Sequence, residues 1–218
     1  MRKFIMSFSR GIITLLIIGI ALIGMSHEAG FAALKKPVDF DYLLDNKPET
    51  GMHVKGDVMY IYDCFASEET YTERRDGSRS GSKLTSEYYI LPAEGEYPFV
   101  VLQAPADDSG WLGKIIDETW EYLEYGTEPK TKVAVDGYIV KAEKDLKKLL
   151  DDYLLDVWEY TEAELAGADI LVIKQPGGSM TTSLCFLLGG FLAIIGAVVW
   201  YVINLKREFK YENKECDI

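Results

Sequence analysis

Residues that commonly carry catalysis are sparse in this sequence. His27 and His53 are its two histidines, so few residues could supply the histidine of a Ser-His-Asp or Cys-His catalytic arrangement. The G-x-S-x-G, H-E-x-x-H and P-loop motifs and paired C-x-x-C spacings do not occur in the chain. The sequence therefore predicts no catalytic residue, no cofactor-binding residue and no metal ligand.

Acidic side chains are the remaining candidates for a catalytic or metal-binding role, but each group is also explained by a position on the solvated surface. Three aspartates lack the glycine and closing glutamate of a calcium-binding EF-hand, which indicates a solvated turn: Asp39, Asp41 and Asp45. Three glutamates are expected on the solvated side of a helix: Glu118, Glu121 and Glu124. A pair of facing carboxylates, as glycosidases use, stays open as an alternative.

Four basic residues gather within ten positions of one predicted loop: Arg74, Arg75, Arg79 and Lys83. The surrounding segment ETYTERRDGSRSGSK carries Gly77 and Gly81 among serines and threonines, which predicts a mobile loop. A basic tip on an acidic domain suits contact with lipid headgroups, a wall polymer or an acidic partner. A solvated hairpin tip is the alternative.

Charge is unevenly distributed along the chain. The formal net charge is −12, and residues 26–180 hold 31 acidic against 16 basic side chains. An acidic domain does not suit nucleic acid, whose backbone requires cationic contacts. Anionic headgroups also repel it, so we expect this part of the chain to stand clear of the membrane surface.

An apolar run near the C-terminus predicts a membrane span. Residues 184–203 form 20 consecutive uncharged positions, and a helix of that length covers roughly the 30 Å of a bilayer core. Trp200 and Tyr201 suit the interfacial belt. The basic residues that follow place the tail in the cytoplasm by the positive-inside rule: Lys206, Arg207, Lys210 and Lys214.

The N-terminal apolar run permits two interpretations. Arg2, Lys3 and Arg10 precede an uncharged segment over residues 11–25, which is the length of a long signal-peptide core. If Arg10 extends toward the interface, residues 4–25 are long enough to cross as an uncleaved anchor, which we favour. Both interpretations leave residues 26–180 outside the cytoplasm. The anchor predicts a two-span protein of the cell membrane with both termini cytoplasmic.

Small residues recur along one face of the second span. Gly189, Ala193 and Ala197 are spaced by four, and such rows let helix backbones approach closely. We expect this face to pack on the first span, where Gly19 and Gly24 have no side chains and let another helix come close, or on another copy of the chain. Leu187 and Leu188, elsewhere on the helix, are expected to face lipid.

The three cysteines fall in three different compartments of this topology. Cys64 alone lies outside, Cys185 lies in the span and Cys216 lies in the tail, so an intrachain disulfide outside is excluded. The strand pattern around Cys64 favours a buried small hydrophobe. A reactive thiol or an intermolecular bridge is the alternative.

Apolar periodicity predicts an α+β domain between the two spans. Five strands are expected, the first within VKGDVMYIYDCFA and the last at ADILVIK. A first helix carries Trp111, Trp120 and Leu123 at helical spacing, and a second carries an apolar stripe from Leu146 to Trp158. Three strands, a helix and a strand follow the order of an OB-like barrel, so a mainly antiparallel five-stranded domain is predicted.

These patterns divide the chain into six parts. They are an anchor or signal peptide over 1–26, a lead-in over 27–50, the α+β domain over 51–175, a tether over 176–181, the second span over 182–204 and a cytoplasmic tail over 205–218.

Three segments carry a family resemblance: VKGDVMYIYDCFA, EYYILPAEGEYPFVVL and LVIKQPGG before a span. With the layout of the chain, they resemble uncharacterised small two-span membrane proteins of Gram-positive gut bacteria. The resemblance implies the same topology and a cytoplasmic-membrane location.

A membrane-anchored extracytoplasmic binding or assembly module is the function that these patterns favour. The expected partners are the lipid bilayer, another membrane or cell-surface protein, and further copies of the chain. The alternative function is a cell-surface hydrolase that uses paired carboxylates.

Overall fold

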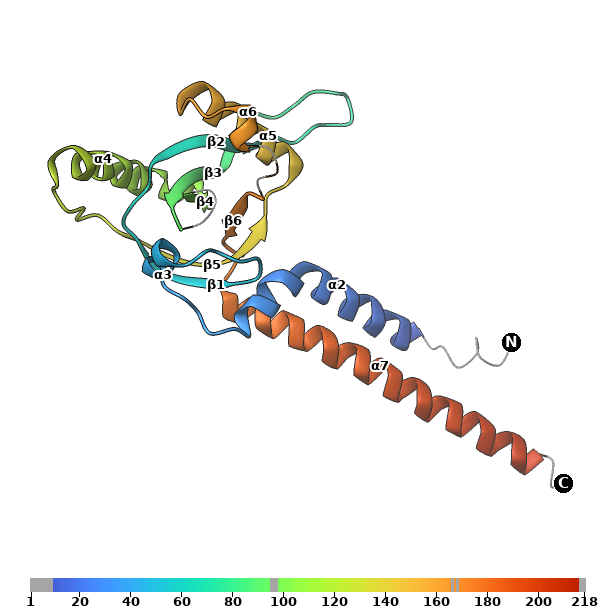
Figure 1. Ribbon diagram of the computed structural model, residues 1–218. Helices are drawn as coiled ribbons and strands as arrows, with labels where there is room; N and C mark the ends of the chain where they lie inside the picture. Colours follow the sequence, from blue (N-terminus) through green and yellow to red (C-terminus); the bar gives the residue numbers. More distant parts are fainter. Residues whose placement is uncertain (1–9, 95–97, 166, 168, 216–218) are drawn as a thin grey trace. The chain divides into compact units, whose positions relative to one another are not determined.

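The computed structural model describes residues 10–94, 98–165, 167 and 169–215, and it divides the chain into two compact units (Figure 1). The first unit combines the two ends of the chain, Met1–Leu34 and Met180–Ile218. The second unit, Lys35–Ser179, contains the sheet.

The first unit is a pair of antiparallel helices, α2 (Arg10–Ala33) and α7 (Met180–Glu215). Gly11 near the start of α2 lies against Trp200, whereas Gly30 near its end lies against Leu187. Residues early in α2 therefore contact residues late in α7, so the two helices run antiparallel. Both helices are long and apolar enough to cross a membrane.

In the described residues of the second unit, six strands form one open sheet in the order β1-β5-β6-β4-β3-β2. The strands are β1 (His53–Val58), β2 (Asp63–Thr70), β3 (Lys83–Pro92), β4 (Phe99–Pro105), β5 (Val133–Lys141) and β6 (Leu171–Lys174). The β4–β6 pair is parallel, with Val101 opposite Val172, and the other pairs are antiparallel.

The α+β class is confirmed, but the five-stranded OB-like order is wrong. The segment read as one first strand contains two, β1 and β2, which lie at opposite edges of the sheet. Residues 59–62 between them form a connection, in which the Ile61 amide donates to Thr119 Oγ1 at 3.1 Å. The side chain of Ile61 is fully buried, so a buried connection produced the apolar pattern that resembled a strand.

Helices cover both faces of the sheet and create two cores. On one face, α4 (Ser109–Tyr125) contributes Leu112 and Ile115, and α3 (Phe40–Asp45) contributes Leu43. On the other face lie Leu150 of α5 (Lys144–Val157) and Leu165 of α6 (Glu162–Leu165). A short 3-10 turn, η1 (Ala106–Asp108), precedes α4.

Coverage on both faces explains the continuous apolar runs of the central strands. In β4, Val100 and Leu102 point into the core under α4, whereas Phe99 and Val101 point into the core under α5. Alternate residues of a strand project to opposite faces, so a strand that is buried twice needs apolar residues throughout.

The segment expected as a lead-in contributes to both units. Helix α2 continues to Ala33, and Val38 then forms a bridge to Val54 outside the edge strand β1. Asp39 caps α3, because its carboxylate accepts from the Phe40 amide at 2.7 Å. This cap gives one of the three early aspartates a structural role.

Candidate functional site

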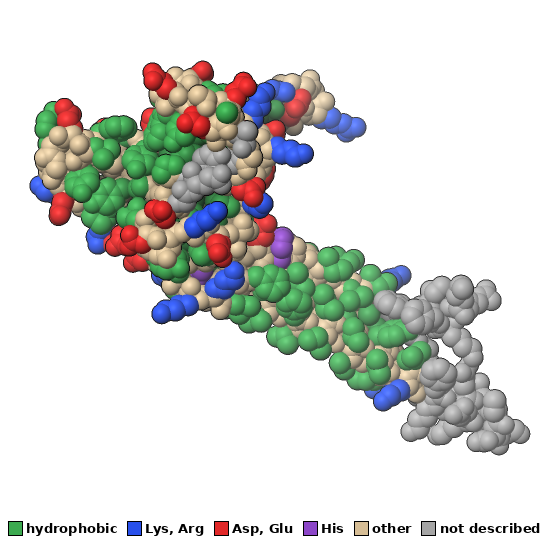
Figure 2. Space-filling view, in the orientation of Figure 1, with side chains coloured by type: hydrophobic (Ala, Val, Ile, Leu, Met, Phe, Trp, Pro, Cys, Tyr) green, Lys and Arg blue, Asp and Glu red, His purple; other side chains and the backbone are tan. Residues whose placement is uncertain are grey.

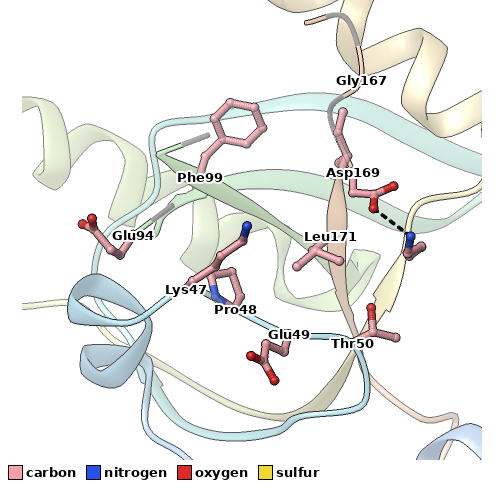
Figure 3. Close-up of a pocket in the computed structure, with 11 residues that line it drawn as sticks. Lys47, Pro48, Glu49, Thr50, Glu94, Phe99, Gly167, Asp169 and Leu171 are labelled. Atoms are coloured by element: carbon pink, nitrogen blue, oxygen red, sulfur yellow. Dashed lines mark hydrogen bonds and ion pairs between the residues drawn. The ribbon is translucent and has the colours of Figure 1, made fainter. Parts of the chain in front are cut away.

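A cleft of about 310 Å³ opens where β5 ends and where β4 and β6 begin (Figure 3). Phe99 and Leu171 line it from the sheet, and the loop over Lys47–Thr50 lines it from the opposite side. The side chain of Lys47 extends into the middle of the cleft in Figure 3. The cleft therefore combines apolar walls with a cationic group.

One carboxylate of the cleft, Asp169, is held in an ion pair. Lys141 Nζ lies 2.7 Å from Asp169 Oδ2. The hydrogen bond and charge of Lys141, together with the charge of Lys47, lower the pKa of Asp169. A carboxylate with a lowered pKa stays ionised at neutral pH, whereas a glycosidase acid needs a raised pKa.

A second open groove, of about 460 Å³, runs between α5 and the sheet face beneath it. Tyr88 donates its hydroxyl hydrogen to Glu68 at 3.1 Å, and Lys174 pairs with Glu143 at 3.2 Å. Burial and the nearby Glu68 raise the pKa of Tyr88 to about 12, so this phenol stays protonated and holds the Glu68 carboxylate in place.

The last turns of α4 extend past the sheet and form an exposed aromatic surface, which we call the aromatic overhang (Trp120–Tyr125). Thr119 is 2% exposed, and all six residues after it in the helix are exposed. Trp120 is 51% exposed and Tyr125 is 72% exposed. Figure 2 shows hydrophobic side chains gathered over this end of α4.

Two rings of the aromatic overhang, Trp120 and Tyr122, contact the connection between β1 and β2 although they are exposed. Trp120 Nε1 donates to the carbonyl oxygen of Tyr62 at 2.9 Å, and the rings of Tyr60 and Tyr122 pack with centroids 5.5 Å apart. Gly126 ends the helix in the left-handed conformation, with φ at 73°. These contacts hold the rings of Trp120 and Tyr122 in place in the absence of a partner.

Glu118 anchors the chain that returns from the aromatic overhang. Its Oε2 accepts from the amides of Lys130 and Thr131, each at 2.7 Å, and its Oε1 accepts from Thr131 Oγ1 at 2.7 Å. The bonds from Thr131 contribute most to lowering the pKa of Glu118 to about 2. This glutamate therefore has a structural partner.

The predicted basic loop forms a small hairpin between β2 and β3, which we call the basic ribbon (residues 71–83). A bridge joins Glu73 and Arg79, and the Arg79 guanidinium lies 4.5 Å from the centre of the Tyr71 ring. The tip turns at Gly77, whose φ is 81°. Arg74 and Arg75 are exposed at this tip, and Lys83 begins β3.

Gly190 lies where α2 and α7 approach each other closely. A Cβ added to Gly190 would lie 2.9 Å from the carbonyl oxygen of Gly19 and 2.7 Å from Ile23. Buried or half-buried residues of α7 follow a spacing of four and three, the pattern of a coiled-coil seam: Ser183, Leu187, Gly190, Ile194 and Ala197.

The structure distributes the predicted helix-packing residues around this seam. Ala197 lies within it and is fully buried, and Ala193 lies at its margin, with its Cβ 3.4 Å from a Cβ built on Gly19. A Cβ added to Gly189 would meet open space. The expectation that Leu187 faces lipid is wrong, because its side chain is 1% exposed and lies against Gly30.

The cysteines and acids of the described residues show no sign of metal chemistry. No group of three or more His, Cys, Asp or Glu side chains in that part of the chain is placed to hold a metal ion. Cys64 and Cys185 are free thiols, and Cys216 lies outside the described residues. Burial and the nearby Glu87 raise the pKa of Cys64 to about 11.

A family of unknown function accounts for nearly the whole chain. The family described as Domain of unknown function (DUF8577) matches residues 2–204. The chain belongs to the DUF8577 family. No curated protein matches the chain. The DUF8577 match includes α2, the domain between the helices and α7 up to residue 204. A family of unknown function thus covers most of the chain, as the predicted resemblance to uncharacterised proteins implied.

The aromatic overhang is the surface that the sequence did not predict. Trp111, Trp120 and Leu123 were expected in the apolar stripe of the helix, but all three are more than half exposed. The charge pattern gave a signal, because residues 115–129 contain five acidic side chains and no basic one. A helix end that carries so many like charges is expected in solvent.

Proposed function

We propose that the chain is a binding or assembly module held in the cell membrane by α2 and α7, with its sheet domain outside the cytoplasm. The observation that carries this proposal is the antiparallel pairing of two apolar helices drawn from the two ends of the chain. Such a pair anchors one domain through both of its ends.

The surfaces of the two helices support a lipid environment. They pair through one seam, and the remaining faces expose large apolar side chains, including Ile17, Ile20, Leu188, Leu192 and Ile195. Each large aliphatic side chain left in water forgoes about 1.5–3 kcal/mol of burial free energy. A bilayer removes this cost along the whole pair.

The antiparallel pairing also supports the proposed orientation. It puts Arg10 at the start of α2 and Lys206 and Arg207 of α7 at the same end of the pair, whereas Glu28 belongs to the other end. The positive-inside rule assigns the basic end to the cytoplasm. Both termini are then cytoplasmic, and residues 26–180 lie outside.

The aromatic overhang supports a binding role for the domain. Exposed Trp and Tyr rings that are already fixed lose little conformational entropy when a partner covers them, and such residues dominate the energetics of protein interfaces. We favour binding over the hydrolase alternative because of this exposed surface. The lowered pKa values of Glu118 and Asp169 also make these two carboxyl groups unsuited to the role of a general acid.

Photo-crosslinking in intact cells tests this proposal. A photoreactive amino acid at Tyr125 is expected to give a protein adduct, and the same residue at Lys148, exposed on α5 across the sheet from α4, serves as the control. Adducts at 125 and not at 148 support a binding surface on α4. Absence of adducts at 125, or equal adducts at both positions, contradicts it.

A further inference from the structure

The outer face of the aromatic overhang combines acids with aromatic rings. Trp120 and Glu124 are four residues apart, as are Glu121 and Tyr125, so each carboxylate lies beside a ring on the helix surface. A hydrogen bond to Glu124 is the main cause that raises the pKa of Tyr125. A carboxylate beside an exposed ring is a combination that suits a guanidinium group, which stacks on the ring and pairs with the acid.

The basic ribbon carries the complementary groups. Arg74 and Arg75 are exposed at its tip, and backbone hydrogen bonds hold the turn beneath them, from the Arg74 amide to Ser78 at 2.7 Å and from the Gly77 amide to Arg74 at 2.9 Å. Arg79 is occupied by Tyr71 and Glu73. The ribbon thus presents two arginines on a formed hairpin.

One chain cannot join these two surfaces within its own domain. The ribbon projects beyond β2 and β3 on one side of the sheet domain, and α4 extends on the opposite side (Figure 1). In the same orientation, Figure 2 shows Lys and Arg side chains on the ribbon's side and hydrophobic side chains with acids on the side of α4.

We propose that the basic ribbon of one chain docks on the aromatic overhang of another copy, so that the domains assemble head to tail. This inference rests on the proposed function and names the partner of the same surface. Because the two contacting surfaces differ, each copy offers one free ribbon and one free overhang, and the assembly extends into a row or closes into a ring.

Charge complementarity supports a copy of this chain as the occupant. The aromatic overhang (Trp120–Tyr125) has two acids and no base, whereas the basic ribbon (residues 71–83) holds four basic side chains against two acidic ones. Confinement to one membrane raises the effective concentration of copies, so a small contact between a hairpin and a helix end suffices.

The test uses the full-length chain in phosphatidylcholine liposomes, with donor and acceptor fluorophores on separate copies. Wild-type chains are expected to show energy transfer that falls as salt is raised. Arg74→Glu with Arg75→Glu, and separately Glu121→Lys with Glu124→Lys, should each weaken self-association about tenfold or more, the range for reversing charges at an interface. Wild-type chains without energy transfer overturn the proposal.

Mixing the two variants provides the decisive comparison. In the mixture, the acidic ribbon of the first variant can pair with the basic overhang of the second. The native ribbon of the second variant can pair with the native overhang of the first. A 1:1 mixture should therefore recover wild-type energy transfer. Lys144→Glu with Lys148→Glu changes the net charge equally on exposed positions of α5 and should leave association unchanged. A mixture that stays dissociated, or a control that dissociates equally, contradicts the proposal.

Crosslink mapping on otherwise native chains separates this inference from the proposed function. With the photoreactive residue at Tyr125, a product of two chains joined through peptide 71–83 supports head-to-tail assembly. An adduct with a different protein overturns the assembly inference and leaves the proposed binding function standing. No adduct at all contradicts both. Because this measurement uses neither charge variant, it holds even if a variant fails to fold.

Discussion

Burial decides the chemistry of single residues in this domain. Cys64 is half-buried in β2, its thiol donates to the carbonyl oxygen of Ala66, and its raised pKa keeps it protonated at neutral pH. The sequence favoured a small buried hydrophobe at this position, whereas in the structure the side chain is half-buried and its thiol is hydrogen-bonded. A thiol in this state is a poor nucleophile.

Thiol labelling tests this reading of Cys64. A rise of about two pKa units lowers the thiolate fraction near neutral pH about a hundredfold, so alkylation of Cys64 should be at least that much slower than that of a Cys introduced at exposed Ser78. The comparison is made at pH 7.5 in a chain with Cys185→Ala and Cys216→Ala. Equal rates at positions 64 and 78 would show that the thiol is activated.

Glu118 gives a pH-dependent prediction. Its folded-state pKa is lowered from 4.5 to about 2, so its stabilising effect is present above pH 4.5 and is lost as the pH falls through the folded value. Glu118→Gln should lower the urea midpoint at pH 7 and flatten the decline between pH 4.5 and 2, as followed by Trp fluorescence. Glu121→Gln is the matched control on the same helix. Parallel pH profiles for the Glu118→Gln variant and the wild type would contradict the assigned role.

The elements differ in how far their sequence patterns determine them. Helices α2, α4, α5 and α7 follow from apolar periodicity and were predicted. The split between β1 and β2 did not follow, because the buried connection around Ile61 is as apolar as a strand. The packing of α7 on α2 depends on which small residue of α7 lies against the backbone of α2. Four-residue spacing alone does not show whether that residue is Gly189 or Gly190.

Neighbouring glycines of α7 provide a test of the helix pair. Gly190→Leu should weaken the pair by on the order of 1 kcal/mol, since its side chain would meet Ile23 and the backbone of Gly19. Gly189→Leu should be tolerated, because the added atoms meet open space. Both losses are measured as shifts in the unfolding midpoint of the full-length chain in detergent micelles. Equal losses from both leucine variants would refute the seam.

At the scale of the whole molecule, the sequence predicted an α+β domain flanked by two apolar helices, and the structure has both. It did not predict the aromatic overhang, because a stripe of aromatic residues on a helix is usually part of the core. Only the structure shows that the helix extends past the sheet that would bury them. Nor did it predict the cleft, whose walls come from four parts of the chain that topology alone brings together.

Topology is the whole-molecule prediction. In intact cells, a Cys introduced at Ser78 should react with a membrane-impermeant maleimide, and Cys216 should react only after lysis. The control is the same labelling on permeabilised cells, where both sites should react. Reaction at position 78 only after lysis would place the domain in the cytoplasm.

The position of β6 has a consequence for biosynthesis. This strand is the last of the sheet to be made, yet it lies between β4 and β5, so until residue 174 emerges the sheet consists of two separate parts, β1 with β5 and β2 with β3 and β4. A two-stranded sheet such as β1 with β5 is marginal alone, whereas three strands that pack against a helix, as β2, β3 and β4 do with α4, reach the size needed for independent stability. In the proposed topology the sheet is completed only when the segment just before α7 has been made, which couples maturation of the domain to membrane insertion. A nascent chain arrested after Asp169 should accordingly be cleaved by protease within β1 and β5, and the full-length chain should resist cleavage there.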